Sequence, residues 1–141
     1  MCHHRKVVVV IPAYNAARTL RRTYDEIMHQ EIVDASILVD DQSRDDTVCA
    51  ARELPGVPVH VRDVNRGYGG NQKSCYRLAL ETGADIVIMV HPDSQYTPKL
   101  IPAMASIIAS GLPPCALGGR ILGGYALRGG VPSWKYVANR A

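Results

Sequence analysis

The chain has 141 residues, of which 47% are hydrophobic and 21% charged, and its formal net charge is +3. This length suits one compact domain and excludes two ordinary ones, and the interspersed charges form no basic stripe that would indicate nucleic-acid binding. Four cysteines without a C-x-x-C pair argue against a secreted disulfide scaffold, and no apolar run approaches the roughly 18 residues of a membrane span. We therefore expect a soluble cytoplasmic domain, with a place at the cytoplasmic face of a membrane left open.

The N-terminal part of the chain predicts a strand and a helix that follow a disordered segment, residues 1–6. Val7–Ile11 is a continuous apolar run that ends at Pro12, which is typical of a parallel strand buried on both faces. We expect Asn15 to cap the next helix. The apolar residues of that helix recur at helical spacing: they are Leu20, Tyr24, Ile27 and Met28.

An acidic run follows the second predicted strand, Ile37–Val39. Ser43 followed by Asp46 is typical of the start of a helix, so Asp45 and Asp46 are expected at the helix N-terminus, where the macrodipole favours them. Asp40 and Asp41 are expected to point into a crevice at the carboxyl end of the strand, because open α/β sheets bind ligands there. The alternative for the whole run is helix capping in a solvated turn.

A third strand and a third helix are predicted next. Val57–Val61 alternates apolar residues with Pro58 and His60, which indicates a half-buried strand near the sheet edge. The loop 63–70 leads into a helix that ends at Gly83. The buried face of this helix is predicted to consist of Cys75, Leu78 and Ala79.

The C-terminal part begins with the strand Ile86–Val90 and a helix that Thr97 caps and Pro98 starts. The apolar stripe of this helix is predicted to be Leu100, Ile101, Met104, Ile107 and Ile108. Ala116 and Leu117 are expected to form a short last strand. Residues 118–141 are expected to form a glycine-rich loop and the first turns of a helix.

Strands that alternate with helices predict an α/β fold, a mostly parallel sheet flanked by helices on both faces. Polar or glycine residues follow each predicted strand, and the carboxyl ends of parallel strands meet at one edge, so these residues predict a ligand crevice. They are Ala13, Tyr14 and Asn15; Asp40 and Asp41; Asn65, Arg66 and Gly67; and His91 and Asp93. No Walker A motif exists, and the partial glycine motif follows the third strand instead of the first, which argues against a dinucleotide dehydrogenase.

The residue types in this crevice suit a nucleotide sugar. Carboxylates can bind a base or ribose, and arginine and glycine can bind phosphates. Asp93 lies beside His91, where a divalent cation could bridge a carboxylate and a diphosphate.

Five segments resemble the inverting family 2 glycosyltransferases of the GT-A (Rossmann-like) fold, and among them the polyprenyl-phosphate (dolichol-phosphate) sugar synthases. The segments are Val9–Asn15, Ile37–Thr47, Asn65–Lys73, Ile86–Tyr96 and Leu117–Ile121, and together they extend over nearly the whole chain. The resemblance implies transfer of a hexose from a UDP- or GDP-sugar, with inversion, to a polyprenyl-phosphate or saccharide acceptor. A phosphate acceptor is already ionised near neutral pH and would need no general base.

The resemblance also implies residue roles, including an acceptor-side position for residues 118–141. Asp93, Arg66 and Lys73 would be the catalytic residues, and Asp93 with His91 would hold a Mn²⁺ or Mg²⁺ ion. The expected nucleotide-sugar contacts are Pro12, Ala13, Tyr14, Asn15, Asp40, Asp41, Gly67, Gly69 and Arg120.

The chain departs from the family pattern at two positions and in length. Ala16 replaces an acidic residue, and His91 replaces the first aspartate of the metal motif. An imidazole is a poor Mg²⁺ ligand and a better Mn²⁺ ligand, and a plain hydrogen-bonding role for His91 is the alternative. Family members usually continue beyond this length. A catalytically weak or inactive nucleotide-sugar-binding domain that works in an assembly therefore stays open, as do a purely structural domain, membrane contact and homo-oligomerisation.

Overall fold

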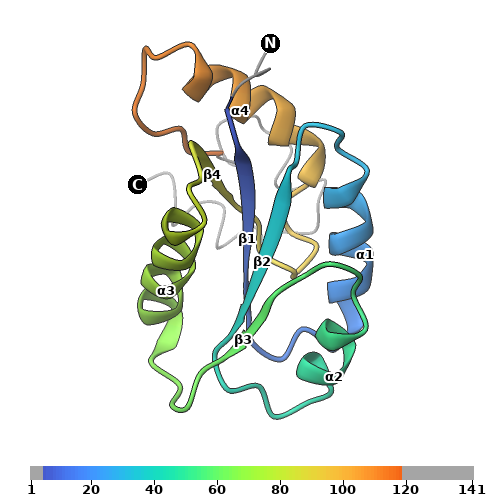
Figure 1. The fold of residues 1–141 in the computed structure, drawn as a ribbon. Coiled ribbons are helices and arrows are strands. Elements are labelled where there is room, and N and C mark those ends of the chain that lie inside the picture. Colours follow the sequence, from blue (N-terminus) through green and yellow to red (C-terminus); the bar gives the residue numbers. More distant parts are fainter. Residues whose placement is uncertain (1–4, 119–141) are drawn as a thin grey trace, which may run out of the picture.

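The computed structural model describes residues 5–118, which form a four-stranded parallel sheet in the order β3-β2-β1-β4 with helices on both faces (Figure 1). The strands are β1 (Val7–Ala13), β2 (Ala35–Asp40), β3 (Val59–Val61) and β4 (Ile86–Met89). The helices are α1 (Ala17–Met28), α2 (Thr47–Arg52), α3 (Gly67–Glu81) and α4 (Ile101–Ala109), and the 3-10 helix η1 (Pro98–Leu100) precedes α4. The parallel α/β architecture predicted from the sequence is confirmed.

The first strand, β1, lies at the centre of the sheet. It pairs in parallel with β2 and with β4, so that Val10 lies opposite Ile37 on one side and Met89 on the other. All of its residues are buried, as the apolar run predicts. A strand covered on both faces needs apolar side chains at every position, because successive side chains point to opposite faces.

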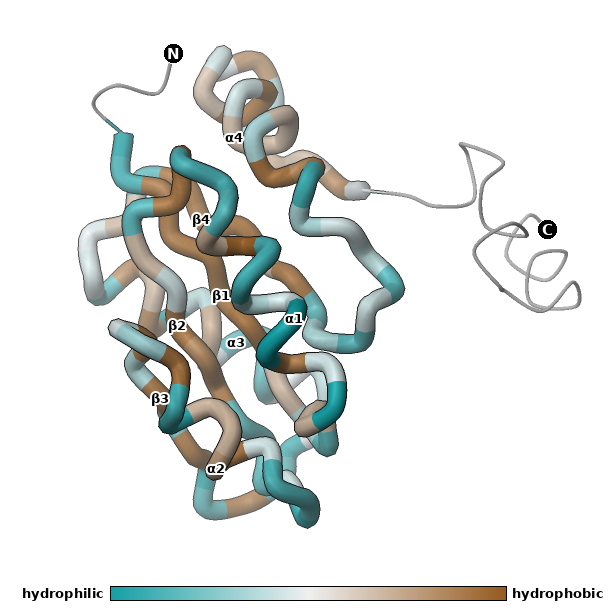
Figure 2. The backbone as a smooth tube through the Cα atoms, turned by 90° about the vertical axis from the view of Figure 1, so that its right-hand side faces the viewer, coloured by the Kyte–Doolittle hydropathy of each residue, from teal (hydrophilic) through white to brown (hydrophobic). Residues whose placement is uncertain are grey.

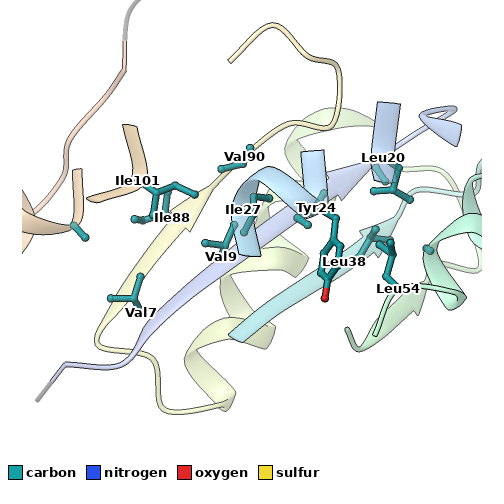
Figure 3. Close-up of a cluster of buried hydrophobic side chains, with 14 of the residues drawn as sticks. Val7, Val9, Leu20, Tyr24, Ile27, Leu38, Leu54, Ile88, Val90 and Ile101 are labelled. Atoms are coloured by element: carbon teal, nitrogen blue, oxygen red, sulfur yellow. The ribbon is translucent and has the colours of Figure 1, made fainter. Parts of the chain in front are cut away.

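Two hydrophobic cores lie on the two faces of the sheet. Val7, Val9 and Leu38 pack against α1, α2 and α4 on one face (Figure 3). Val8 and Val10 pack on the other face against Cys75 and Ala79 of α3. Figure 2 shows the hydrophobic colouring concentrated in the central strands, with hydrophilic stretches in the outer segments. The fold is therefore a three-layer arrangement in which the carboxyl edge of the sheet is the place for polar loops.

The edge strand β3 is shorter than predicted. It begins at Val59 instead of Val57, and Val61 is 45% exposed although the alternation predicts it inside. Pro58 has no N–H group for the ladder, but its carbonyl accepts a hydrogen bond from the Leu38 N–H. The exposure of His60 agrees with the prediction.

Two predicted helix caps are wrong. The N-cap of α1 is Ala16, not Asn15, which has a φ of +50° and accepts a hydrogen bond from the Arg44 N–H at 2.8 Å. Ser43 does not start α2, because its N–H and hydroxyl both donate to the Asp40 carboxylate. In place of capping a helix, the Asn15 side chain bonds to the turn after β2, and the Ser43 side chain bonds within that same turn.

The predicted C-terminal elements are partly corrected. In the η1–α4 segment, Ile101 is buried, but Leu100, which lies in the 3-10 turn before α4, and Ile107 are about half exposed. No strand forms at Ala116 and Leu117. Residues 119–141, with Arg120, lie outside the described part of the chain.

The start of the chain is also corrected at one residue. Lys6, in the segment 1–6 for which disorder was predicted, donates its N–H to Asp85 at 2.7 Å and accepts from the Ile86 N–H at 3.0 Å. Across residues 5–118, no helix is long and apolar enough to span a bilayer.

Candidate functional site

A cavity of about 550 Å³ lies where the carboxyl ends of the strands meet. The loop after β1 forms one wall, Asp41 after β2 forms another, and residues after β3 and β4 complete it. Parallel strands place these loops at the same edge of the sheet. The lining residues are Pro12, Ala13, Tyr14, Asn15, Ala16, Thr19, Asp41, Asn65, Gly67, Tyr68, His91, Pro92 and Asp93.

Asp41 is a buried carboxylate in the wall of this cavity, with 3% of its surface exposed. Its Oδ1 accepts a hydrogen bond from the Arg66 N–H at 3.1 Å and lies 3.5 Å from Nε of Arg62. Its own N–H donates to the Ala13 carbonyl at 2.9 Å, which fixes it against the end of β1. Both side-chain contacts use the same oxygen, so Oδ2 remains as an acceptor.

Asp40 is fully buried and does not line the cavity. Its Oδ2 accepts from the Ser43 N–H at 2.9 Å, and its Oδ1 accepts from the Ser43 hydroxyl. The expectation that both aspartates point into the crevice is therefore corrected for Asp40. Consecutive residues at a strand end point to opposite sides, so only one of the pair reaches the cavity.

Asp45 joins the beginnings of two helices. Its carboxylate accepts from the Thr47 N–H at 3.0 Å, from the Thr47 hydroxyl and from the Ala17 N–H at 3.2 Å. The hydrogen bond from the Thr47 hydroxyl is the main cause that lowers the pKa of Asp45. Asp46 is the N-cap of α2, so the predicted position of these two aspartates at the helix start is confirmed.

The N-terminus of α3 lies at the cavity. The helix starts at Gly67, inside the predicted loop 63–70, and Gly67 has a φ of +71° and donates its N–H to Asn65 Oδ1 at 2.9 Å. Gly67 and Tyr68 both line the cavity. The first N–H groups of an α-helix lack intrahelical partners and, with the macrodipole, attract anions. The structure thus places an anion-attracting element beside Asp41.

Four other predicted site residues do not line the cavity. Asp40 is internal, as described above. Arg66 is the exposed N-cap residue of α3, and Gly69 and Lys73 lie in the first two turns of this helix and are exposed. The Arg66 N–H nevertheless donates to Asp41, a residue of the cavity wall.

An aromatic pair, Tyr68 and His91, forms part of the cavity wall. The rings of Tyr68 and His91 stack with centroids 5.2 Å apart, and the Tyr68 hydroxyl lies 3.1 Å from His91 Nε2. Gln72 Nε2 donates to the Tyr68 hydroxyl at 2.7 Å, and the Tyr96 ring lies near the His91 ring in a tilted arrangement with centroids 6.2 Å apart. Burial lowers the pKa of His91, although the Asp93 charge opposes this. A neutral imidazole is therefore held in place by its neighbours.

Asp93 is exposed at the mouth of the cavity, and its Oδ1 accepts from the Gln95 N–H at 2.9 Å. Among the described residues, no group of three or more His, Cys, Asp or Glu side chains could hold a metal ion. Mg²⁺ is commonly bound by one or two carboxylates together with substrate phosphates. The donor set thus fits a divalent cation that Asp93 shares with a diphosphate, and does not fit a cation held by protein alone.

A larger cavity, of about 1200 Å³, lies next to the first one. Tyr68, His91 and Asp93 line both cavities, and β4, η1 and α4 contribute to the larger one. These three side chains therefore stand at the boundary between the two spaces.

Sequence reasoning missed Tyr68, Thr19 and Arg62. Tyr68 lies in the segment Asn65–Lys73, but the neighbouring sequence does not indicate that its ring stacks on His91. The Thr19 hydroxyl, in the first turn of α1, donates to the Pro92 carbonyl in the loop after β4. Arg62 is the first residue after β3, and this position at the carboxyl edge is the signal that could have revealed it.

Comparison with known proteins extends these observations. Residues 8–139 match the family model for glycosyl transferase family 2. Undecaprenyl-phosphate mannosyltransferase of Micrococcus luteus is 28% identical over 107 residues, which are 73% of this chain and 44% of that protein. UDP-N-acetylglucosamine–dolichyl-phosphate N-acetylglucosaminyltransferase of Methanococcus voltae is 26% identical over 131 residues, which are 82% of this chain and 52% of that protein. The chain thus spans about half the length of these relatives.

Solved structures agree with the family match. Glucosyl-3-phosphoglycerate synthase from Mycobacterium tuberculosis in complex with UDP has a TM-score of 0.66 and 25% identity, over 86% of this chain and 47% of that chain. The same enzyme in complex with Mn²⁺, UDP-glucose and phosphoglyceric acid has a TM-score of 0.65 and 26% identity, over 79% of this chain and 42% of that chain. The described domain has the GT-A fold of these neighbours, as the sequence resemblance implies. The chain belongs to glycosyl transferase family 2.

Proposed function

We propose that this chain binds a UDP-sugar in the smaller cavity and supports transfer of its hexose, with inversion, to a polyprenyl-phosphate or saccharide acceptor. One observation carries the proposal: Asp41, the N-terminus of α3 and Asp93 converge on one cavity. They are a hydrogen-bond acceptor, an anion-attracting helix end and a carboxylate suited to a shared cation. A nucleoside diphosphate needs all three.

The nucleoside would lie against Tyr14 and Asp41. Because Asp41 Oδ1 already accepts from Arg66 and faces Arg62, only Oδ2 is open to a ligand. Uracil presents a single N–H donor on its pairing edge, whereas guanine presents two adjacent donors that would engage both carboxylate oxygens. This difference favours UDP over GDP, and the UDP complexes of the related synthase support the same choice.

The diphosphate would lie between the start of α3 and Asp93. Hydrogen-bond donors and positive charge aimed at the leaving group stabilise the charge that develops when the glycosidic bond to the diphosphate breaks. The N–H groups of the first turn of α3 that follow Gly67, whose own N–H is donated to Asn65, supply donors there, and the long side chains of Arg66 and Lys73 can approach from the same helix. A bound Mn²⁺ or Mg²⁺ would add Lewis-acid stabilisation, with Asp93 as its carboxylate ligand.

His91 would act as a hydrogen-bonding residue of the wall. Gln72 Nε2 donates to the Tyr68 hydroxyl, so the tyrosine proton is free to be donated to Nε2 of the neutral His91. This direction of donation engages the Nε2 lone pair and puts the remaining ring proton on Nδ1. His91 then carries its proton on Nδ1 and has no free lone pair for a metal, so Asp93 alone is the protein ligand for a cation.

The acceptor would enter from the larger cavity, whose boundary with the smaller one carries Asp93. The relatives named for polyprenyl-phosphate acceptors support an acceptor of that class. A phosphate is ionised near neutral pH and needs no general base. A lipid-linked acceptor would bring the protein into peripheral contact with the cytoplasmic face of a membrane.

Asp93→Asn tests the proposal. We expect calorimetry of the 141-residue chain to show UDP binding that Mn²⁺ tightens, and GDP binding that is weaker. Asp93→Asn should abolish the Mn²⁺ effect and lower turnover of UDP-glucose, by transfer or hydrolysis, on the order of 10²-fold. Asp25→Asn is the matched control, because Asp25 is exposed on α1 in an ion pair with Arg21. Unchanged Mn²⁺ dependence and unchanged turnover in Asp93→Asn would refute the assignment.

A nucleotide-sugar-binding domain without turnover is the second candidate. Ala16 brings no carboxylate to the cavity, and the metal-ligating side chains of the described residues that line it form no group that could hold a metal ion by itself. Binding of UDP-glucose with no product release in the same experiment would favour this candidate.

A further inference from the structure

Arg62 is a largely buried arginine directly after β3, with 14% of its side chain exposed. Its N–H donates to the Asp40 carbonyl at 3.0 Å, which continues the pairing of β3 with β2 beyond the end of the strand. Arginine is seldom buried unless its charge is paired. Arg62 does not line the smaller cavity, so its burial does not come from a direct place in the wall.

The guanidinium of Arg62 connects the end of β2 to α3. Nε lies 3.5 Å from Asp41 Oδ1, and Nη1 donates to the Ser74 hydroxyl at 3.0 Å. Ser74 in turn donates to the Gly70 carbonyl at 3.2 Å, within α3. The guanidinium thus makes one contact with the cavity carboxylate, Asp41, and another with Ser74 of α3.

Asp41 carries the connection to the start of α3. The oxygen that faces Arg62 also accepts from the N–H of Arg66, the N-cap residue of α3. The packing around these groups is close, because a Cβ atom on Gly70 would lie 2.7 Å from Arg66 Cβ and 3.5 Å from Arg62 Nη1. Arg62, Asp41 and the first turn of α3 therefore behave as one packed unit.

From this geometry we infer that Arg62 is a positioning residue for nucleotide binding, which acts through Asp41. The inference rests on the proposed function and adds a residue outside the cavity wall. With Arg62 in place, Oδ1 of Asp41 is held and Oδ2 has a fixed direction toward a ligand. Without it, the buried carboxylate loses its cationic partner and is no longer held in one orientation.

Substitution of Arg62 tests the inference in the 141-residue chain. We expect Arg62→Met, which keeps an unbranched stem and removes the guanidinium, to raise the Kd for UDP on the order of 10-fold or more, as loss of a charged hydrogen-bonding partner does. Arg62→Lys should recover part of the affinity, because it restores the charge without the planar fork. Arg77→Met should leave the Kd unchanged, since Arg77 is exposed on α3 and pairs with Glu81.

A double-mutant cycle with Asp41→Asn separates positioning from a general effect on the fold. Because Arg62 acts through Asp41, Arg62→Met should change the Kd for UDP much less in the Asp41→Asn background than in the wild type. Equal effects in the two backgrounds, or an unchanged Kd in Arg62→Met, would overturn the inference. Absence of UDP binding by the wild type would instead remove the proposed function, and this inference with it.

Ser74→Ala covers the case in which Arg62→Met does not fold. This substitution keeps both charges but removes the partner of Nη1, so the guanidinium is no longer fixed beside Asp41. We expect a several-fold higher Kd for UDP with a cooperative unfolding transition like that of the wild type. A Kd equal to that of the wild type would count against Arg62 as a positioning residue.

Discussion

Asp40 and Asp41 are adjacent aspartates with different surroundings. Asp40 is enclosed and bonds to Ser43, its neighbour in the turn, whereas Asp41 bonds to Arg66 and faces Arg62. The local sequence pattern predicts an acidic pair at a strand end, but it does not show which aspartate is internal and which lines the cavity. The division comes from partners that only folding brings to the carboxyl edge.

Asp45→Asn tests the residue that joins α1 and α2. The pKa of Asp45 is lowered in the folded chain, so its ionised form stabilises the fold above its ordinary value of 3.8, and this contribution is lost as the pH falls through the folded pKa. We expect the substitution to lower the free energy of unfolding at pH 7 by about 0.5–1 kcal/mol, since the group is exposed and screened. Urea unfolding at pH 7 and at pH values below 3.8 would measure the difference, which should shrink on acidification.

Asp46→Asn is the matched control for that experiment. It removes the same charge from the same helix end, but Asp46 makes no capping hydrogen bond with its side chain. We therefore expect a smaller loss of stability. A loss of equal size in the two variants, or one independent of pH, would contradict the role given to Asp45.

At the scale of elements, α3 shows that a glycine-rich stretch can form the first turn of a helix. Gly67 has a positive φ, Gly69 has open space around it, and Gly70 lies against two arginines. The glycine cluster predicts a loop, because glycine is unfavourable in the interior of a helix. Here the glycines lie in the first turn, whose N–H groups have no intrahelical partners and can be bonded by residues outside the helix. The Gly67 N–H donates to Asn65 Oδ1 and the Arg66 N–H donates to Asp41 Oδ1, and these two hydrogen bonds anchor that turn from outside.

Gly69→Ala and Gly70→Ala separate these roles. Gly69→Ala should stabilise the protein by up to about 1 kcal/mol, because alanine favours the helix and its Cβ meets no atom within 4 Å. Gly70→Ala should cost about 1–3 kcal/mol and weaken UDP binding, because Arg66 and Arg62 must move to admit the Cβ. Urea unfolding and calorimetry would measure both effects. Similar behaviour of the two variants would show that the close packing at Gly70 is unimportant.

At the scale of the molecule, the sheet separates two cores and leaves one edge for chemistry. Alternate residues of β1 and β2 face the α1, α2 and α4 layer and the α3 layer. The apolar spacing of α1 and the run in β1 indicate this arrangement from the sequence. The stripe predicted around α4 is less accurate, because the 3-10 turn η1 rotates Leu100 outward and the core uses Ala105 instead.

Leu38→Ala tests how much of the stability lies in the larger core. Leu38 is fully buried on β2 and packs with α1 and α2 (Figure 3), so truncation should cost about 2–5 kcal/mol. Leu80→Ala on α3 is the control, because Leu80 is 65% exposed and should change stability by less than about 0.5 kcal/mol. Denaturant titration would measure the two free energies. Equal losses would contradict the assignment of the core.

The sequence by itself determined the order of strands and helices, the parallel sheet and the polar residues at its carboxyl edge. These features depend on periodicity and on residues close together in the chain, such as the Val7–Ile11 run and the motif that contains Asp41. The tertiary structure decided which polar residues share a cavity: Asp41, Gly67, Tyr68 and His91 do, and Asp40 does not. It also revealed Arg62 behind Asp41. The reason is that burial and pairing of charges depend on contacts between strand ends, and no local pattern encodes those distances.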